Sequence, residues 1–470
     1  MSSAPESTAH VSVPISRVVL VAATAALGGF LFGFDTAVIN GAVSAIQQEF
    51  GLGDFMLGFA VSSALIGCAV GAWFAGRIAD RYGRIRVMVI AAILFVVSAL
   101  GCGLAFGVWD LSFWRIVGGL GVGAASVIAP AYIAEVSPPA HRGRLGSLQQ
   151  LAIVTGIFVA LLTAAVIVAL AGSSTNEWLL GLQAWRWMFL AEIVPAVIYG
   201  LLALTIPESP RFLIARGEVK KAQEVLTRFV GGDVEKTTTD IIKTVEGKSE
   251  RPKFSILRGG KFGLLPIVWI GIGLSALQQF TGINVIFYYS STLWQAVGFT
   301  EQDSLTITVI TSVTNIVTTI VAIMLIDKVG RRPLLLVGAI GQFACLLVLA
   351  IVFATATVVD GSPVLEGAAG PTALVAANLY VVFFGVSWGP VVWVMLGEMF
   401  SNKIRALALS VAAAAQWTAN FIISTTFPGL ASLGLGIAYG VYTFFAFVAI
   451  FFVLRFIKET KGRTLESMTD

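Results

Sequence analysis

Three ionisable residues lie inside long apolar segments of this chain and could carry a proton. Asp35 and Arg115 each interrupt an apolar run long enough to cross a bilayer. A charge at the bilayer centre costs about 2.5–3.5 kcal/mol on insertion scales, so residues of this kind are usually functional. Glu192 lies in another such run and is expected to face the same interior. Burial raises the pKa of a carboxyl group, and a neighbouring cation lowers it. Movement of Asp35 relative to Arg115 would therefore let the acid take up and release a proton.

The three residues therefore predict a proton-coupling site. The alternative is a permanent ion pair between Asp35 and Arg115 that only holds two helices together.

A second set of polar residues suits a neutral ligand rich in hydroxyl groups. An amide side chain offers both a donor and an acceptor, which fits a sugar and fits an ion poorly. Such residues occur in corresponding runs of the two halves of the chain, at Gln149, Gln150, Gln278, Gln279, Asn284, Tyr288, Tyr289, Asn315, Gln416 and Asn420. The aromatic side chains that could stack on a sugar ring are Phe32, Trp388, Trp393 and Trp417. The alternative is that the amides only bond one helix to another.

Gln279 and Asn284 would face different sides of a straight helix, because each residue turns the helix by about 100°. Thr281 and Gly282 lie between them and predict a break. Broken helices are where binding sites near the bilayer midplane form.

Charged motifs repeat in the two halves of the sequence. Asp80-Arg81-Tyr82-Gly83-Arg84 matches Asp327-Lys328-Val329-Gly330-Arg331-Arg332, and each is followed by a carboxylate and a guanidinium seven residues apart, Glu135 with Arg142 and Glu398 with Arg405. Repetition of this kind predicts a duplicated unit that rocks about a central site. We expect salt bridges here that hold the halves together in one state and separate in the other. The alternative, a topology signal alone, leaves the acidic members unexplained.

Composition places these residues in a membrane. The chain is 57% hydrophobic and 12% charged, which excludes a soluble globular domain. Twelve apolar runs each reach the ~20 residues that a membrane-spanning helix needs. They are Val18–Ile46, Met56–Ala75, Val87–Phe106, Leu111–Ala134, Gly146–Ala171, Trp185–Ile206, Phe262–Val297, Leu305–Ile326, Leu334–Thr357, Leu374–Leu396, Ile404–Leu430 and Gly434–Phe456. The fold class expected is an all-α integral membrane protein with twelve transmembrane helices in two pseudo-symmetric six-helix bundles.

The expected organisation follows from these runs. A tail (residues 1–16) precedes the first bundle (17–207), and a polar linker with short intracellular helices (208–261) joins it to the second bundle (262–457) and a final tail (458–470). Lys and Arg fall in alternate connections only, which predicts that both termini are cytoplasmic. The first run is too long for a signal-peptide core and is expected to be retained. The formal charge of +4 follows from the same bias, so no nucleic-acid partner is expected.

Several motifs together resemble those of the sugar porter family of the major facilitator superfamily, over residues 17 to 466. They are Gly33-Phe34-Asp35-Thr36, Gly76 to Arg84, Arg115 with Gly118-Gly119, Pro207-Glu208-Ser209-Pro210-Arg211, Gln278-Gln279-Phe280-Thr281-Gly282-Ile283-Asn284, Asp327 to Arg332, and Glu459 to Thr464. The Pro-Glu-Ser-Pro-Arg and Gln-Gln-x-x-Gly-x-Asn stretches are the specific ones.

The resemblance implies site residues. Those implied to contact a monosaccharide are Gln150, Gln278, Gln279, Asn284, Gly389, Trp393, Gln416 and Trp417, with Phe32, Tyr288 and Asn315 nearby. The implied cytoplasmic gate consists of Asp80, Arg84, Glu135, Arg142, Glu208, Arg211, Asp327, Arg331, Arg332, Glu398, Arg405 and Glu459. Asp35 stands where proton-coupled bacterial carriers of the family have Asp and animal facilitative carriers have Asn. Ile157 replaces a second Gln of the xylose symporter, which favours glucose over xylose, and Lys458 replaces a Pro.

These observations predict a monosaccharide–proton symporter of the inner (plasma) membrane, which works as a monomer among membrane lipids and needs no cofactor except the proton gradient. A facilitative uniporter, a drug-type antiporter and a sugar sensor are the alternatives. An enzyme finds no support in the sequence, because no set of nucleophile and base or of metal ligands is visible.

Overall fold

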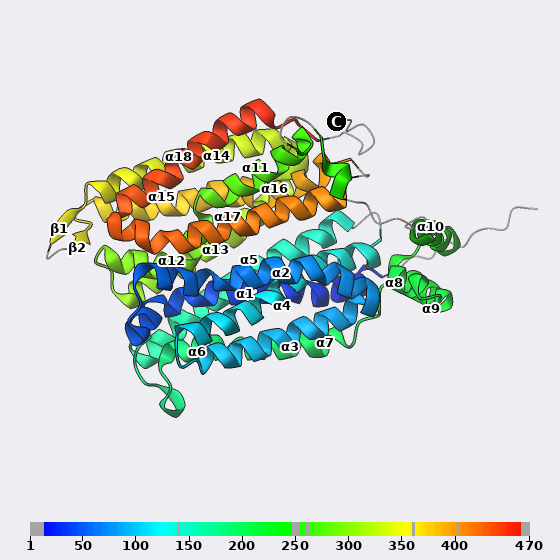
Figure 1. Cartoon of the computed structure of the whole chain (residues 1–470), viewed down its shortest axis with the longest axis horizontal. Coiled ribbons are helices and arrows are strands. Elements are labelled where there is room, and N and C mark those ends of the chain that lie inside the picture. Colours follow the sequence, from blue (N-terminus) through cyan, green and yellow to red (C-terminus); the bar gives the residue numbers. More distant parts are fainter. Residues whose placement is uncertain are drawn as a thin grey trace, which may run out of the picture.

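Twelve membrane-spanning segments form two halves in a computed structural model that describes residues 14–138, 142–246, 254–259, 263–359, 362–401 and 404–461. The first half consists of α1 (Ile15–Phe50), α2 (Asp54–Tyr82), α3 (Arg84–Gly103), α4 (Val108–Val136), α5 (Arg142–Ala171), α6 (Ala184–Leu190) and α7 (Ile193–Ala203). The second half consists of α11 (Pro266–Phe280), α12 (Ile283–Ala296), α13 (Glu301–Val329), α14 (Arg331–Ala354), α15 (Ala369–Phe383), α16 (Gly389–Met399), α17 (Arg405–Leu433) and α18 (Leu435–Phe456). The two halves lie side by side with their helices along one common direction (Figure 1).

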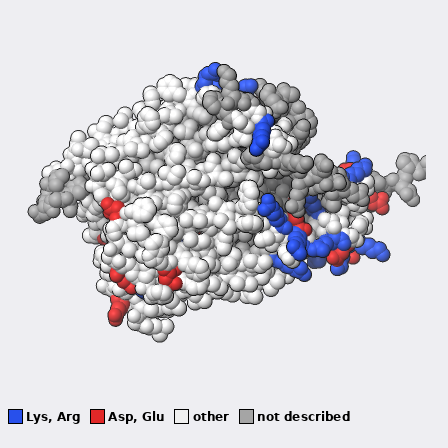
Figure 2. All heavy atoms as spheres, viewed as in Figure 1, with Lys and Arg blue, Asp and Glu red and all other residues white. Residues whose placement is uncertain are grey.

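The two ends of the molecule differ. One end, the linker end, carries α8 (Pro210–Ala215), α9 (Val219–Val225), the π-helical turn η2 (Leu226–Val230) and α10 (Val234–Glu246), with a 3₁₀ turn at Phe254–Leu257 further along the chain (Figure 1). The other, the hairpin end, carries the antiparallel strands β1 (Thr357–Val359) and β2 (Ser362–Val364) and a 3₁₀ turn at Leu179–Gly181. Lys and Arg gather at the linker end of the visible face, whereas the hairpin end shows Asp and Glu (Figure 2).

Three spans are broken, each at residues that cannot continue a regular helix. α6 and α7 meet at Ala191–Glu192, where Pro195 lacks the N–H that would reach back to the Ala191 carbonyl. α11 and α12 meet at Thr281–Gly282, which confirms the predicted break, and Gly282 has a φ of 86°. A π-helical turn, η4 (Phe384–Trp388), joins α15 to α16. Breaks of this kind free backbone groups inside the membrane, where side chains must bond them.

Close packing of α2 against α4 positions the middle of α4. A Cβ on Gly119 would lie 2.0 Å from the Ala64 carbonyl oxygen, and one on Gly123 would lie 2.2 Å from that of Cys68. Gly67 of α2 has the reciprocal contact with Ile116 of α4. Small residues let two backbones touch in this way within a membrane. The position of Arg115 on α4 is fixed by this contact.

Candidate transport site

Arg115 of α4 is buried and bonds to main-chain carbonyl groups. Its Nη1 donates to the carbonyl oxygen of Asp35 at 2.9 Å, and its Nη2 donates to that of Val61 at 3.2 Å. Its guanidinium carbon also lies 6.0 Å from the centre of the Phe189 ring. The guanidinium therefore ties α4 to α1, α2 and α6 without needing a carboxylate partner.

The carboxylate of Asp35 forms no ion pair with Arg115 within 4.0 Å, although the two residues are neighbours. Its Oδ2 is buried, and no described residue hydrogen-bonds to it. The permanent ion pair that the sequence left open is therefore not formed in this conformation. Glu192, at the break between α6 and α7, is 1% exposed and interacts electrostatically with both Asp35 and Arg115. The three residues predicted to couple protons thus lie in one buried region of the first half.

The amides of the second half form a chain of hydrogen bonds across the break between α11 and α12. Asn284 Nδ2 donates to Gln279 Oε1 at 2.5 Å, and Gln279 Nε2 donates to Gln278 Oε1 at 3.2 Å. Gln278 Nε2 donates to the Trp388 carbonyl oxygen at 2.7 Å, where η4 meets α16. Gln278 Nε2 also donates to the Gly389 carbonyl oxygen at 3.4 Å, whereas the amide nitrogens of Gln279 and Asn284 each keep a second hydrogen that can donate to a ligand hydroxyl group. The broken helices therefore present a set of aligned donors.

Other predicted ligand-binding residues form smaller groups of their own. Asn420 Nδ2 donates to the Tyr288 hydroxyl at 3.5 Å. Phe32 and Trp417 come from opposite halves, and their ring centres lie 5.8 Å apart. Trp393 is 41% exposed, and Gly389 is buried at the start of α16.

The remaining predicted residues form no side-chain hydrogen bond with the amide chain among the described residues. Gln416 is 9% exposed with an unbonded Oε1, and Asn315 is 7% exposed. Gln150 is half-buried. Its neighbour Gln149 is buried against Gly29 of α1, and no described residue bonds to either atom of its amide.

A set of hydrogen bonds joins the two halves toward the hairpin end of the described chain. Asn40 of α1 donates to the Phe287 carbonyl oxygen and to Ser290 Oγ, both at 3.0 Å, and its own carbonyl accepts from Ser291 Oγ at 2.6 Å. Further pairs across the same interface are Ser62 with Thr425, Asp54 with Ser432, Ser44 with Thr292, and Glu301 with Ser173 and Ser174. The sequence analysis missed this interface. Asn40 could have been found by the criterion that found Asn315, an amide inside an apolar run.

Two matching clusters of charge lie at the linker end, one in each half. In the first, Arg84 makes a double hydrogen bond with Glu135 at 3.0 and 3.1 Å, and Asp80 lies 3.2 Å from the same guanidinium. Glu208 accepts from the main-chain N–H of Arg84 at 3.0 Å, and Ser209 Oγ donates to Glu135 at 2.5 Å.

The second cluster repeats this pattern residue by residue. Arg331 bonds doubly to Glu398 at 2.8 and 3.1 Å, with Asp327 3.0 Å away. Glu459 accepts from the N–H groups of Arg331 and Arg332, and Thr460 Oγ1 donates to Glu398 at 2.6 Å. The motifs around Glu208 and Glu459 are therefore structural counterparts, a relation that the sequence analysis did not draw.

Gly83 and Gly330 make the two clusters possible. They have φ values of 102° and 105°, which other residues rarely adopt. A Cβ on Gly83 would also lie 2.3 Å from Glu208 Oε2, and one on Gly330 would lie 2.8 Å from Glu459 Oε2. The carboxylates then reach the N-termini of α3 and α14, where anions are stabilised.

The sequence predicted salt bridges that join the halves in one state and separate in the other, and in this conformation each ion pair of the two clusters joins residues of the same half. Glu398 and Arg405, which lie seven residues apart, do not bond to each other in this conformation. Arg405 donates to the Phe400 carbonyl oxygen, since Glu398 is already occupied by Arg331. Glu135 bonds to Arg84, and the side chain of Arg142 lies outside the described part of the structure. Arg211 is half-buried, and Arg332 donates to the Leu454 carbonyl oxygen.

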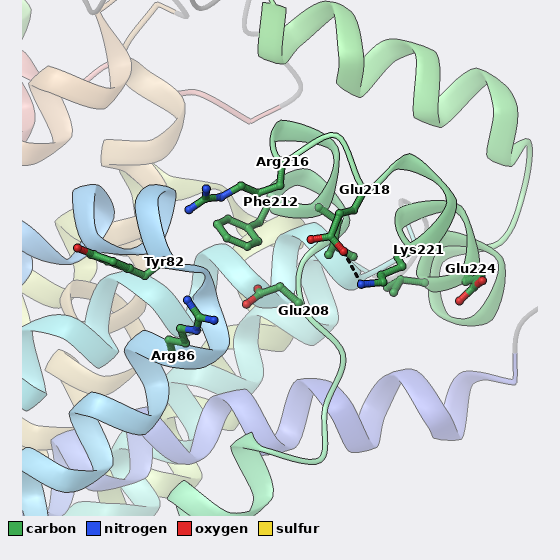
Figure 3. A pocket seen from close by; sticks show the side chains of 10 residues that line it. Tyr82, Arg86, Glu208, Phe212, Arg216, Glu218, Lys221 and Glu224 are labelled. Atoms are coloured by element: carbon green, nitrogen blue, oxygen red, sulfur yellow. Dashed lines mark hydrogen bonds and ion pairs between the residues drawn. The ribbon is translucent and has the colours of Figure 1, made fainter.

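A pocket of about 680 Å³ lies at the linker end between the turn from α2 to α3 and the helices α8 and α9. Its labelled side chains come from both sides of this junction (Figure 3). Arg86, Arg216 and Lys221 face Glu208, Glu218 and Glu224 there, and Lys221 bonds to Glu218 at 2.5 Å (Figure 3). The charged residues that line this pocket are thus three basic and three acidic ones. The pocket is separate from the amide chain and the buried acids.

The whole architecture matches known membrane carriers. A family model described as "Sugar (and other) transporter" matches residues 21–470. The chain belongs to the sugar transporter family. The twelve spans make this sugar transporter a multi-pass protein of the plasma membrane and a secondary transporter. No group of three or more His, Cys, Asp or Glu in the described ranges could hold a metal ion.

Relatives and solved structures cover nearly the whole transporter. It is 61% identical over 469 residues to a "Glucose transport protein" of Synechocystis, covering 99% of each chain. It is 37% identical over 486 residues to the "D-xylose-proton symporter" of Escherichia coli, covering 96% of this chain and 95% of that protein. The inward open conformation of the xylose transporter XylE from E. coli is similar, with a TM-score of 0.79 and 35% identity over 97% of this chain and 99% of that one. A further XylE structure, of a major facilitator superfamily protein, has a TM-score of 0.78 and 36% identity over 97% of this chain and 98% of that one. The fold is that of the major facilitator superfamily.

The amide chain yields a prediction on ligand affinity. Gln279→Ala should weaken sugar binding by about 1–3 kcal/mol, because a ligand hydroxyl and the side-chain oxygen of Gln278 would each lose a hydrogen-bond partner. Tryptophan fluorescence or calorimetry on the purified protein measures this directly. Gln342→Ala is the matched control, since Gln342 is a buried amide of α14 that no described residue bonds. Parent-like affinity of a folded Gln279→Ala variant for each candidate sugar would show that the site lies elsewhere.

The second cluster yields a prediction on stability and pH. Partial burial raises the pKa of Glu459, but N–H groups of Lys461, Arg331, Arg332 and Thr460 outweigh it, and the pKa lies below its ordinary value. Because the folded-state pKa is depressed, the stabilisation is present above the ordinary pKa of Glu and is lost as pH falls through the depressed one.

Glu459→Gln should therefore lower the free energy of unfolding at pH 7 by roughly 0.3–1 kcal/mol, which is what an anion contributes at a helix N-terminus. The thermal midpoint at pH 7 should fall accordingly. The difference from the parent should shrink as the solution is acidified. Glu366→Gln, an exposed acid at the hairpin end, is the control. A gap of the same size at pH 7 and in acid would contradict the assigned role.

Proposed function

We propose that this protein imports glucose together with a proton by alternating access. The observation that carries the proposal is the Asp35 carboxylate, which is buried beside Arg115 without an ion-pair partner, while both Nη atoms of Arg115 donate to main-chain carbonyl groups. A carboxylate held in this way can change its protonation without breaking the helix contacts that Arg115 makes. An acid that only joined helices would be expected to pair with the guanidinium.

Glucose is the favoured substrate among monosaccharides. The 61% identical relative is named a glucose transport protein, whereas the xylose symporter is 37% identical. Ile157 is half-buried and stands where the xylose symporter has a second Gln. The first half therefore offers one amide fewer, which suits a ligand that is held mainly by the second half. The amide chain from Asn284 to Gln278 supplies hydrogen bonds, and Phe32 with Trp417 supplies an apolar face.

The cross-half hydrogen bonds support a closed hairpin end and an open linker end. If the linker end is cytoplasmic, this conformation faces inward, like the structures titled inward open and partially occluded inward open, with TM-scores of 0.79 and 0.80. The outward-facing state then requires that the bonds around Asn40 break. We propose that the two linker-end clusters form the cytoplasmic gate, whose charged residues exchange partners across the halves when that end closes.

The orientation rests on the concentration of Lys and Arg at the linker end. In a variant without the three native cysteines, Glu177→Cys should react with an impermeant thiol reagent added outside cells, and Lys220→Cys should not. Both positions are exposed, on opposite ends. The reverse labelling pattern would place the termini outside.

Loss of the titratable group tests the coupling. Asn keeps the size of Asp35 but cannot carry a proton, so Asp35→Asn should retain sugar binding and sugar exchange while losing accumulation against a gradient. The measurement is uptake of labelled glucose into proteoliposomes with an imposed proton gradient. Parent protein without the gradient is the control. Accumulation by Asp35→Asn at the parent level would make Asp35 a structural acid and favour another route for the proton.

A further inference from the structure

We infer that Gly118 of α4 is a positioning residue for the proton carrier, because the space left by its missing side chain holds the Asp35 carboxylate. A Cβ built on Gly118 would lie 2.9 Å from Asp35 Oδ1 and 2.5 Å from Ser98 Oγ. Both distances are shorter than carbon–oxygen contacts in well-packed interiors. This inference rests on the proposed function, in which Asp35 carries the proton.

The neighbouring glycines of α4 differ from Gly118 in what they touch. Gly119 and Gly123 approach main-chain atoms of α2, so they serve close helix packing. Gly118 meets side-chain atoms only, from α1 and α3. The backbone contacts of Gly119 and Gly123 hold α4 in place, and Gly118 then offers a fixed opening that faces the acid.

Hydrogen bonds hold the Ser98 hydroxyl and the main chain of Asp35 in place beside Gly118. Ser98 Oγ donates to the Trp114 carbonyl oxygen at 2.8 Å, one turn before Gly118 on the same helix. The Asp35 main chain is held by Arg115 through its carbonyl group. An added methyl group would therefore displace the carboxylate itself, toward or away from the guanidinium, rather than shift the helices.

Asp35 is not among the residues proposed to contact the sugar, so sugar binding should survive its displacement. Proton coupling should fail. A reacting group that moves by a fraction of an ångström to an ångström can lose between about tenfold and a hundredfold in rate. We expect this loss in proton-driven accumulation and a changed pH dependence of uptake. Sugar exchange at equal concentrations on both sides, which needs no net proton transfer, should stay within a few-fold of the parent.

The test compares Ser98→Ala with Ser98→Ala/Gly118→Ala in proteoliposomes. The first change removes the hydroxyl 2.5 Å from the new methyl group, so that the closest contact left in the double variant is with Asp35 Oδ1 at 2.9 Å, followed by the Cβ of residue 98 at 3.1 Å. Ser98→Ala should accumulate glucose. The double variant should lose accumulation by about tenfold or more and keep exchange. Gly121→Ala is the control on the same helix, because its Cβ would meet atoms no closer than 3.2 Å.

Asp35→Asn separates failure of this inference from failure of the proposed function. If Asp35→Asn accumulates glucose, the proposed proton carrier is wrong. If Asp35→Asn does not accumulate it but Ser98→Ala/Gly118→Ala accumulates like Ser98→Ala, Asp35 remains the carrier and the role of Gly118 is overturned. Adding Gly118→Ala to Asp35→Asn/Ser98→Ala should leave exchange unchanged, because the acid it would misplace and the hydroxyl it would strike are both already gone. Slower exchange in that triple variant would make Gly118 a packing glycine.

Discussion

The cost of keeping a guanidinium away from water determines how the first half is arranged. Arg115 is 2% exposed and cannot lose its proton, so acceptors must come from the protein. The carbonyl groups of Asp35 and Val61 supply them, which fixes where α1 and α2 pass α4. The close contact between α2 and α4 through Gly119 and Gly123 makes that geometry possible. The Asp35 carboxylate is consequently left without an ion-pair partner, and the proposed proton coupling depends on that arrangement.

The second half meets the same constraint with neutral groups. Its spans break at Gly282 and at η4, and breaks in a membrane leave carbonyl groups that require donors. The Gln278 amide bonds one of them, and the chain through Gln279 to Asn284 extends from that anchor. In the proposed mechanism, one half therefore holds the proton site and the other most of the sugar site. Coupling between them then has to pass through the interface, where Phe32 meets Trp417.

Patterns with a strong physical signal were predictable from the sequence. Twelve apolar runs, the repeated charged motifs and the break at Thr281–Gly282 all follow from length, composition and periodicity, and the structure confirms them. The partners of individual charges did not follow. Arg405 follows Glu398 by seven residues, yet Arg331 comes from another helix and bonds to that carboxylate, while Arg405 donates to a main-chain carbonyl group. Spacing along one helix gives no information on a competitor from elsewhere in the fold. The contact of Gly118 with Asp35 was likewise hidden, because both residues are far apart in sequence and a glycine has no side chain to signal it.

The central claim is that each sugar crosses the membrane with a proton, and charge movement tests it most directly. Proteoliposomes on a solid-supported electrode would receive a jump in glucose concentration, with equal pH on both sides. The account predicts a transient current of positive charge moving in the direction of the sugar, which is abolished by a proton ionophore that short-circuits the membrane. Glucose uptake at the same protein density without any charge movement would contradict it.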